Sequence, residues 1–254
     1  MDLNLAGKKV IVTGGSKGIG AATVKAFLEE GAQVAFCARG LEGIQAFEKE
    51  LEAMQGAKGQ AFGLPCDVSN PADFAKFFEQ AISRLGGLDV FVANVSGGAH
   101  GGEEGWLSAF NTDIMATVRG CDLALPHLAQ AGGAITVVAS IAATHVLGNP
   151  GPYGAAKAAL VNYASQLGDV AARHGVRVNC VSPGPIYVKD GFWGQLEHDN
   201  PQAVEQVKAQ HPMGRLGETE EVAKPIVYLS SSAASWVNRC NMIIDGGFSR
   251  SIQF

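Results

Sequence analysis

Seven short apolar runs alternate with longer helix-like segments along this 254-residue chain, and the alternation strongly constrains its fold. The runs are rich in Val, Ile and Phe with little polar alternation, which is typical of parallel strands covered on both faces. Such strands need crossover connections, so the pattern predicts a doubly wound α/β sheet of Rossmann type with about seven strands. The predicted strands are Lys9–Thr13, Gln33–Cys37, Gln60–Leu64, Val90–Asn94, Ala134–Ala139, Val176–Val181 and Asn241–Ile244.

The segments between the strands have helical patterns and recognisable helix starts. Asn70 and Pro71, for example, combine a capping residue with a proline near the first turn. No linker or repeat divides the chain, so we expect one domain over residues 1–254. The predicted helices are Ile19–Glu30, Leu41–Gln55, Pro71–Leu85, Trp106–Gln130, Pro152–His174 and Glu218–Ser232.

One segment, Tyr187–Met213, interrupts the alternation. It carries Phe192 and Trp193 and contains a short amphipathic stretch, Pro201–Gln210. Insertions of this length in an α/β fold often form lids over an active site. We therefore expect a substrate loop or lid at about residues 187–213.

Composition excludes several classes of function. Apolar residues make up 47% and charged residues 17%, which indicates a globular chain with a sizeable core. The net charge of −5, with no long basic run, argues against nucleic acid or an anionic membrane as partner. No signal-like start and no apolar run of about 18 residues is present, so we expect a cytoplasmic protein. The five cysteines lack metal-ligand spacing, so we expect reduced thiols and no metal site.

A glycine-rich turn follows the first predicted strand. Gly14, Gly18 and Gly20 lie where that strand gives way to the first helix. Glycine allows the backbone to approach phosphates, and the helix N-terminus supplies amide donors and a favourable dipole. The spacing differs from the common dinucleotide fingerprint and also fits a tight turn alone, but the position directly after a strand favours a pyrophosphate site.

A tyrosine, a lysine and a serine stand in a register that favours proton transfer. Tyr153 and Lys157 are four residues apart and share one helix face. A nearby ammonium lowers the pKa of a phenol from about 10 and permits acid–base chemistry near neutral pH. Ser140, directly after the fifth predicted strand, can hold a substrate oxygen. Together with the glycine turn, these residues predict hydride transfer at a carbon bearing oxygen.

These motifs resemble the short-chain dehydrogenase/reductase family over nearly the whole chain, especially members similar to 3-oxoacyl-carrier-protein reductases. Thr13–Gly20 resembles the family's Thr-Gly-x-x-x-Gly-x-Gly turn, Tyr153 with Lys157 its Tyr-x-x-x-Lys, and Ser140 its catalytic serine. Further matches are Asp67-Val68, Asn94, Pro183-Gly184, Arg215-Leu216-Gly217, Glu221-Val222-Ala223 and Asp245-Gly246-Gly247.

The resemblance implies a role for each matched residue. Tyr153 would be the acid–base, Ser140 would orient and polarise the substrate, and Lys157 would tune the phenol and clasp the nicotinamide ribose. The adenosine and pyrophosphate would be held by Thr13, Gly14, Ser16, Lys17, Gly18, Ile19, Arg39, Asp67, Val68 and Asn94. The nicotinamide end would be held by Tyr153, Lys157, Pro183, Gly184 and Ile186. Relatives are commonly homo-oligomers, tetramers or dimers.

The end of the second predicted strand indicates which cofactor is preferred. NAD-using members usually have a carboxylate there, which binds both ribose hydroxyls. Here the strand runs through Ala38 to Arg39, which can pair with a 2′-phosphate. Lys17 can add a second positive charge. We therefore predict NADP(H) in preference to NAD(H).

Three positions depart from the family pattern. Asp113 stands where the family has the asparagine that completes a catalytic tetrad. In the family this position serves partly through its backbone, so Asp113 either preserves that relay or adds a charge that shifts the pH range. Val188 replaces an expected threonine contact to the carboxamide, and Asn238-Arg239 replaces a frequent Thr-Gly.

The predicted activity is NADP-dependent interconversion of a ketone and a secondary alcohol. Two alternatives stay open: an NAD-dependent sugar, polyol or other alcohol dehydrogenase, and a cofactor-binding sensor that has lost turnover. The substrate, which can be free or carrier-bound, and the physiological direction are not specified by the sequence. The predicted substrate contacts are Ser96, His145, Tyr187 and Trp193, with Gly97, Ile141, Ala142, Leu147, Phe192 and His100 as further wall candidates.

Overall fold

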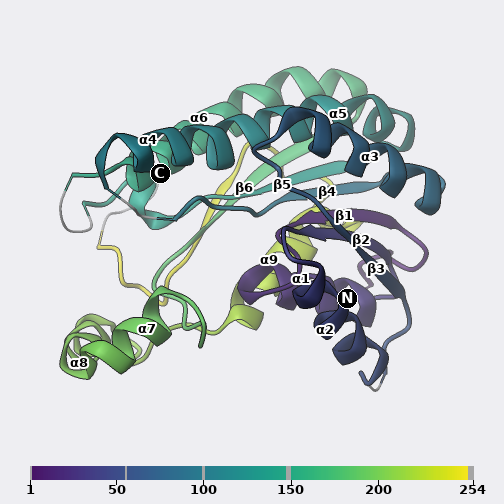
Figure 1. The fold of residues 1–254 in the computed structure, drawn as a ribbon. Coiled ribbons are helices and arrows are strands. Elements are labelled where there is room, and N and C mark those ends of the chain that lie inside the picture. The colour runs from purple at the N-terminus through teal and green to yellow at the C-terminus, as the bar shows by residue number, and fades with distance from the viewer. Residues whose placement is uncertain (1, 55, 99–100, 147–149, 251–254) are drawn as a thin grey trace.

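The computed structural model describes residues 2–54, 56–98, 101–146 and 150–250. Seven strands form one parallel sheet in the order β3-β2-β1-β4-β5-β6-β7, which confirms the predicted doubly wound Rossmann-type fold (Figure 1). The strands are β1 (Lys9–Thr13), β2 (Gln33–Ala38), β3 (Gln60–Pro65), β4 (Val90–Ala93), β5 (Ala134–Val138), β6 (Arg177–Pro183) and β7 (Asn241–Ile244).

Helices cover both faces of this sheet, which explains why its strands are apolar at nearly every position. In β1, Ile11 packs into the core on one face, whereas Val10 and Val12 pack into the core on the other. The first core includes α3 (Pro71–Leu85), α5 (Ala116–Ala131) and α6 (Pro152–Ala171), and the second includes α1 (Gly18–Glu29), α2 (Leu41–Glu52) and α9 (Thr219–Ser230) (Figure 1).

The strand order reverses beside β1, and this reversal positions the site. From β1 the chain proceeds outward through β2 and β3 on one side, then returns to pair β4 with β1 on the other. Successive crossovers therefore leave a crevice at the carboxyl ends of β1 and β4, where ligands of open α/β sheets bind. The glycine turn after β1 and Asn94 after β4 both lie at this crevice.

The structure corrects the sequence prediction of one helix over residues 106–130. The chain instead forms α4 (Gly102–Ala109), a π-helix η1 (Phe110–Met115) and then α5. A π-turn inserts one residue into an otherwise helical path, so the apolar periodicity on either side still reads as continuous helix. The backbone is therefore continuous through this stretch, but the side chains after the insertion are rotated relative to the prediction.

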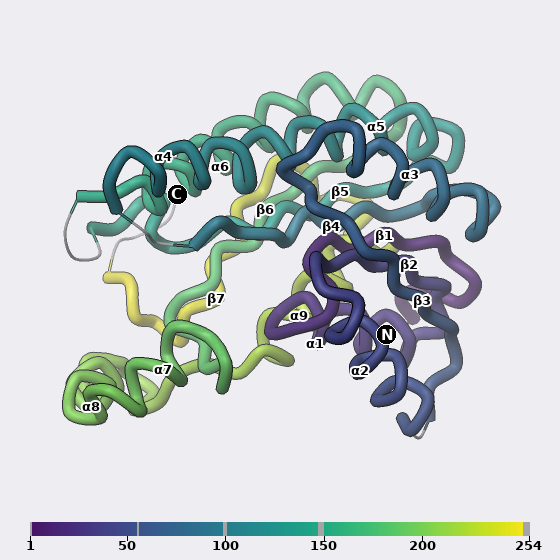
Figure 2. Tube along the Cα trace, viewed as in Figure 1, coloured from purple at the N-terminus to yellow at the C-terminus, as the bar shows by residue number. Residues whose placement is uncertain are grey.

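The segment over residues 187–213 contains two helices rather than one. α8 (Pro201–Gln210) coincides with the predicted amphipathic stretch, whereas α7 (Phe192–Asp199) was not predicted. The two helices pack against each other and lie outside the two helix layers (Figure 2). α7 is short and none of its residues is fully buried, which explains its weak apolar pattern.

Three further observations concern membrane spans, thiols and metal sites in the described part of the chain. None of its helices is long and apolar enough to cross a membrane. Its five cysteines are free thiols, four of them buried. Within those residues, no group of three or more His, Cys, Asp or Glu side chains forms a metal-binding cluster.

Candidate active site

The glycine turn between β1 and α1 has a geometry that requires glycine. Gly14 and Gly18 adopt φ angles of +65° and +52°, in the left-handed region that residues with a Cβ disfavour. A Cβ on Gly20 would overlap the carbonyl oxygen of Gly14 and lie 2.6 Å from Asn94 Nδ2. The turn is thus tightly wound, and α1 starts at its end with unpaired backbone N–H groups that favour an anion.

Asn94 connects this turn to β4. Its backbone N–H donates to Thr13 Oγ1 at 3.0 Å, and its Nδ2 donates to the carbonyl oxygens of Thr13 and Gly14 at 3.0 and 3.2 Å. Thr13 is buried, so it supports the turn from the protein interior. The predicted cofactor residues Thr13 and Asn94 therefore hold the turn in shape, with Asn94 also forming part of the cleft wall.

A cleft of about 820 Å³ opens at the carboxyl ends of β1, β2, β3 and β4. Of the predicted cofactor residues, it is lined by Gly14, Ser16, Lys17, Arg39, Asp67, Val68 and Asn94, together with the predicted substrate residue Ser96. A second cavity, of about 580 Å³ and lined by Lys8, Asp89 and Arg177, lies at the opposite, amino-terminal edge of the strands.

Two cations and two carboxylates line the cleft. Arg39 and Lys17 are both exposed and line the cleft. Asp67 is exposed, and its Oδ1 accepts hydrogen bonds from the backbone N–H and the hydroxyl of Ser69 at 3.0 and 2.7 Å. Glu42, in the first turn of α2, also lines the cleft and was not predicted.

The catalytic candidates come from two neighbouring elements, α6 and the short helix after β5. Ser140 caps the 3₁₀ helix η2 (Ile141–Ala143), and its Oγ accepts the Ala142 N–H at 3.1 Å. Tyr153 and Lys157 lie in the first two turns of α6, with Lys157 Nζ 5.6 Å from the centre of the Tyr153 ring. A Cβ on Gly154 would lie 2.9 Å from the carbonyl oxygen of Ala142, so α6 packs closely on the serine loop.

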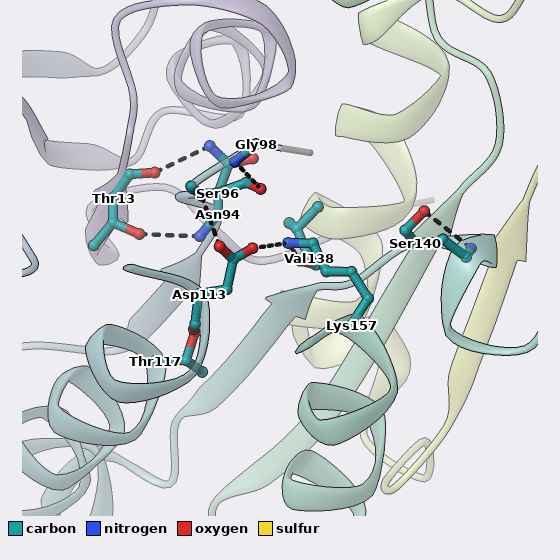
Figure 3. A network of polar contacts seen from close by, with 11 residues as sticks. Thr13, Asn94, Ser96, Gly98, Asp113, Thr117, Val138, Ser140 and Lys157 are labelled. Carbon is teal, nitrogen blue, oxygen red and sulfur yellow. Dashed lines mark hydrogen bonds and ion pairs between the residues drawn. The ribbon is translucent and has the colours of Figure 1, made fainter. Parts of the chain in front are cut away.

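Asp113 forms an ion pair with Lys157, the lysine predicted to be catalytic. Its Oδ1 lies 2.9 Å from Lys157 Nζ, and the two side chains are only 1% and 2% exposed (Figure 3). Lys157 Nζ also lies 3.4 Å from the carbonyl oxygen of Val138, while Asp113 Oδ2 accepts the Gly97 N–H at 2.6 Å. The carboxylate of Asp113 therefore places a negative charge directly beside the Lys157 ammonium, as the second of the two predicted roles requires.

The segment after β6 is fixed by residues that lie far from it in the sequence. Gly184 donates its N–H to the Ile244 carbonyl at 2.9 Å, and a Cβ there would lie 2.6 Å from Asp245 Cβ. Ile186 is buried and pairs with Gly217 in a parallel bridge. Pro183, Gly184 and Ile186 therefore form a rigid stretch beside the site but are not among the residues that line the 820 Å³ cleft.

The predicted substrate contacts lie on three separate segments. The Tyr187 hydroxyl donates a hydrogen bond to Glu197 Oε2 on α7 at 2.9 Å, and this hydrogen bond raises the pKa of the phenol. The ring of Trp193 on α7 packs edge-to-face against that of Phe192, with 5.2 Å between the ring centres. His145 Nδ1 lies 3.0 Å from Thr144 Oγ1. The wall candidates His100 and Leu147 lie outside the described residues.

Comparisons with known proteins show the family. A family model described as enoyl-(acyl carrier protein) reductase matches residues 14–249. The isoepoxydon dehydrogenase of Penicillium expansum is 36% identical over 253 residues, covering 98% of both chains. The chain belongs to the short-chain dehydrogenase/reductase family. It is accordingly an oxidoreductase that acts on alcohol or ketone groups.

Solved structures of short-chain dehydrogenases/reductases superpose on nearly the entire chain. L-sorbose reductase from Gluconobacter frateurii, complexed with NADPH and L-sorbose, has a TM-score of 0.91 at 28% identity, covering 99% of this chain and all of that chain. A 7α-hydroxysteroid dehydrogenase complexed with NADH and a 7-oxo bile acid has a TM-score of 0.88 at 27% identity, covering 99% and 98%.

Sequence reasoning missed part of the cleft wall of this short-chain dehydrogenase/reductase. Ser108, Asn111 and Thr112 line the cleft from α4 and η1. The direction in which these side chains point depends on the π-turn, and the spacing of apolar residues does not reveal a π-turn. Glu42 had a signal, since it stands three residues after Arg39 in the first turn of a helix at the carboxyl end of β2.

Proposed function

We propose that the protein interconverts a ketone and a secondary alcohol, using NADP(H) as cofactor and Tyr153 as acid–base. The observation that carries this proposal is the placement of Tyr153 and Lys157 on one face of α6, with the Ser140 loop packed against the same turn. An acid–base, a neighbouring ammonium and a hydroxyl donor are the three groups that proton transfer to an alkoxide requires.

The residues of the cleft and of the adjoining glycine turn fit a dinucleotide. Gly14, Gly18 and Gly20 allow the backbone to approach a pyrophosphate, and the start of α1 presents amide donors to it. When bound, the nicotinamide donates or accepts the hydride. The exposed Arg39 and Lys17 supply two positive charges where a 2′-phosphate would lie, which supports the preference for NADP(H).

Each catalytic candidate has atoms free for its proposed role. Ser140 Oγ accepts the Ala142 N–H, so its own proton is available to donate to a substrate oxygen. In reduction the Tyr153 hydroxyl donates its proton to that oxygen, and in oxidation the phenolate takes the proton back. The Lys157 ammonium beside the ring stabilises the phenolate in both directions.

Residues 187–213 are proposed to cover the substrate. α7 and α8 lie outside the helix layers, and Phe192 and Met213 expose apolar side chains there. The similarity to L-sorbose reductase favours a second candidate, a sugar or polyol as substrate. Ser96, His145 and Tyr187 would supply the hydroxyl partners that such a substrate needs. A homo-oligomer, tetramer or dimer, stays a prediction from the family resemblance, which light scattering of the purified protein tests. The cytoplasmic location stays a prediction from the sequence.

Replacing the acid–base tests the proposed chemistry. Tyr153→Phe should lower turnover at least a hundredfold while NADPH affinity stays within about threefold, because the hydroxyl moves the proton and the ring does not hold the cofactor. Tyr163→Phe, in the same helix, is the matched control and should retain activity. The assay follows NADPH absorbance with a panel of ketones and sugars. Residual activity of Tyr153→Phe above a tenth of the parent would refute the assignment, and NADPH binding without turnover on any substrate would favour the silent sensor.

Reversing the charge at the end of β2 tests the cofactor preference. Ala38→Asp combined with Arg39→Leu should convert a preference for NADPH into one for NADH. Charge-assisted hydrogen bonds contribute roughly 1.5–3 kcal/mol each, so the parent preference should be about ten- to several-hundredfold. Arg173→Leu, an exposed arginine outside the cleft, is the control. Equal or tighter binding of NADH by the parent, measured as dissociation constants, would contradict the preference.

A further inference from the structure

The two oxygens of the Asp113 carboxylate face different groups: Oδ1 forms an ion pair with the Lys157 ammonium without hydrogen-bond geometry, and Oδ2 accepts a hydrogen bond from the Gly97 N–H. Oδ1 lies 2.9 Å from the Lys157 ammonium and Oδ2 lies 2.6 Å from the Gly97 backbone nitrogen. Both charged side chains are almost completely buried. A carboxylate accepts at both oxygens, whereas an amide accepts at one position and donates at the other. Asparagine would therefore turn its NH₂ group toward either the ammonium or the Gly97 N–H, so the geometry here specifically suits aspartate.

The second partner of Asp113 belongs to the wall of the cofactor cleft. Gly97 lies three residues after Asn94, which is bonded to the glycine turn. A Cβ on Gly97 would lie 3.0 Å from Ser108 Oγ and 3.1 Å from Asp113 Oδ2, so the loop packs closely against α4 and η1. The loop is thus fixed at both ends, by Asn94 on the turn and by Gly97 on the carboxylate, with Ser96 between them.

The π-helix sets the direction of this carboxylate. Asp113 lies in the middle of η1, and its carbonyl oxygen accepts the Thr117 hydroxyl at 2.7 Å. One inserted residue changes the phase of a helix by about 100°. The inserted residue therefore accounts for an acidic side chain that points inward to the lysine, in a stretch whose apolar pattern predicts an uninterrupted helix.

Four elements contribute the groups around the Lys157 ammonium. Asp113 comes from η1, the Tyr153 ring from α6, the Val138 carbonyl from β5 and the Cys180 thiol from β6. Burial raises the pKa of the Cys180 thiol to about 12, so it is neutral near pH 7. Within the described residues, Asp113 is accordingly the negative charge paired with this ammonium.

We infer that Asp113 is a positioning residue that acts through Lys157: its carboxylate keeps the buried ammonium charged and fixed beside Tyr153, and ties it to the cleft loop at Gly97. A buried ammonium that loses its counter-charge favours the neutral amine. A neutral amine no longer stabilises the phenolate. This inference rests on the proposed roles of Tyr153 and Lys157.

A titration of the lysine itself provides the direct test. In protein labelled with ¹³C at lysine Cε, the Lys157 signal is identified by its absence in Lys157→Met. Asp113→Asn should lower the midpoint of that signal by at least about one pH unit. Asp169→Asn makes the same chemical change in an exposed ion pair with Arg239 and should leave the signal unchanged. An unchanged midpoint in Asp113→Asn would overturn the inference.

Kinetics and a double variant complete the test. In Asp113→Asn, kcat/KM should fall at least tenfold as the pH rises through the new lysine midpoint, mainly through kcat. A pH profile parallel to the parent's would contradict the role. If Asp113→Asn does not fold, Asp113→Asn/Lys157→Met should fold, because it removes both charges; failure of the double variant would show that the carboxylate acts independently of the lysine. A shifted Lys157 titration in Asp113→Asn, together with a parent protein inactive on every ketone, would refute the proposed function and support only the effect of Asp113 on the charge of Lys157.

Discussion

Adding one methyl group at Gly20 should dismantle the glycine turn. The new Cβ would overlap the Gly14 carbonyl oxygen and lie 2.6 Å from Asn94 Nδ2, whereas ordinary contacts begin near 3.4 Å. The turn and the amide must therefore separate by roughly 0.8 Å or more, which weakens the hydrogen bonds from Asn94 to Thr13 and Gly14. Overpacking costs about 1–3 kcal/mol and each of the two hydrogen bonds about 0.5–1.5 kcal/mol, so Gly20→Ala should destabilise the fold by about 2–6 kcal/mol.

A matched glycine exists at the same position of the next helix. Gly20 is the third residue of α1 and Gly43 the third residue of α2, but a Cβ on Gly43 meets nothing within 4 Å. Gly43→Ala should therefore stabilise the protein by about 0.5–1 kcal/mol through helix propensity. Urea unfolding measures both variants, and NADPH fluorescence measures the cofactor affinity of Gly20→Ala, which should fall at least tenfold. A Gly20→Ala variant within 0.5 kcal/mol of the parent, with unchanged affinity, would refute the steric reasoning.

Two further predictions concern stability. Arg239 has a φ of +62°, which costs a residue with a Cβ about 1 kcal/mol, and its ion pair with Asp169 is exposed and contributes little stability. Arg239→Gly should therefore raise the free energy of unfolding by up to about 1 kcal/mol. A loss above about 1 kcal/mol in urea unfolding would contradict this prediction. Burial lowers the pKa of His211, against an opposing effect of Asp245, so the folded state disfavours the protonated ring. The contribution of His211 to the free energy of unfolding should be fully present above about pH 6.5 and be lost as the pH falls through the lowered pKa. His211→Gln should reduce that loss. Identical pH dependence of the unfolding free energy in both proteins would exclude the role of His211.

The fold was predictable because its signals are local. Strands covered on both faces need apolar residues at successive positions, and the predicted bounds of β1 and β7 are those of the structure. The glycine turn was predictable for the same reason, since strand, turn and helix start lie within a dozen residues. Tyr153 and Lys157 needed only helical spacing. Each of these features depends on neighbours in the sequence, which a single sequence displays directly.

What the sequence did not show depends on contacts between distant segments. The π-turn in η1 leaves no mark on the apolar pattern, yet it orients Asp113. The ion pair joins residues 113 and 157, and the second partner, Gly97, is visible only once the loop after β4 is placed. α7 escaped prediction because its residues are not fully buried and its stability comes from packing on α8.

Each departure from the family pattern lies close to a residue that accommodates it. Arg239 occupies a backbone position suited to glycine, and its Cγ fits because residue 168 is itself a glycine, where a Cβ would lie 2.8 Å away. Val188 lies beside the glycine turn, since a Cβ added to Gly18 would lie 3.4 Å from Val188 Cγ2. Asp113 is matched in the same way by a backbone donor at Gly97 that satisfies its second oxygen. A single substitution toward the family residue therefore alters only one side of each contact. At the buried Asp113 it leaves the charge of Lys157 without a partner, so stability and activity should change most at that position.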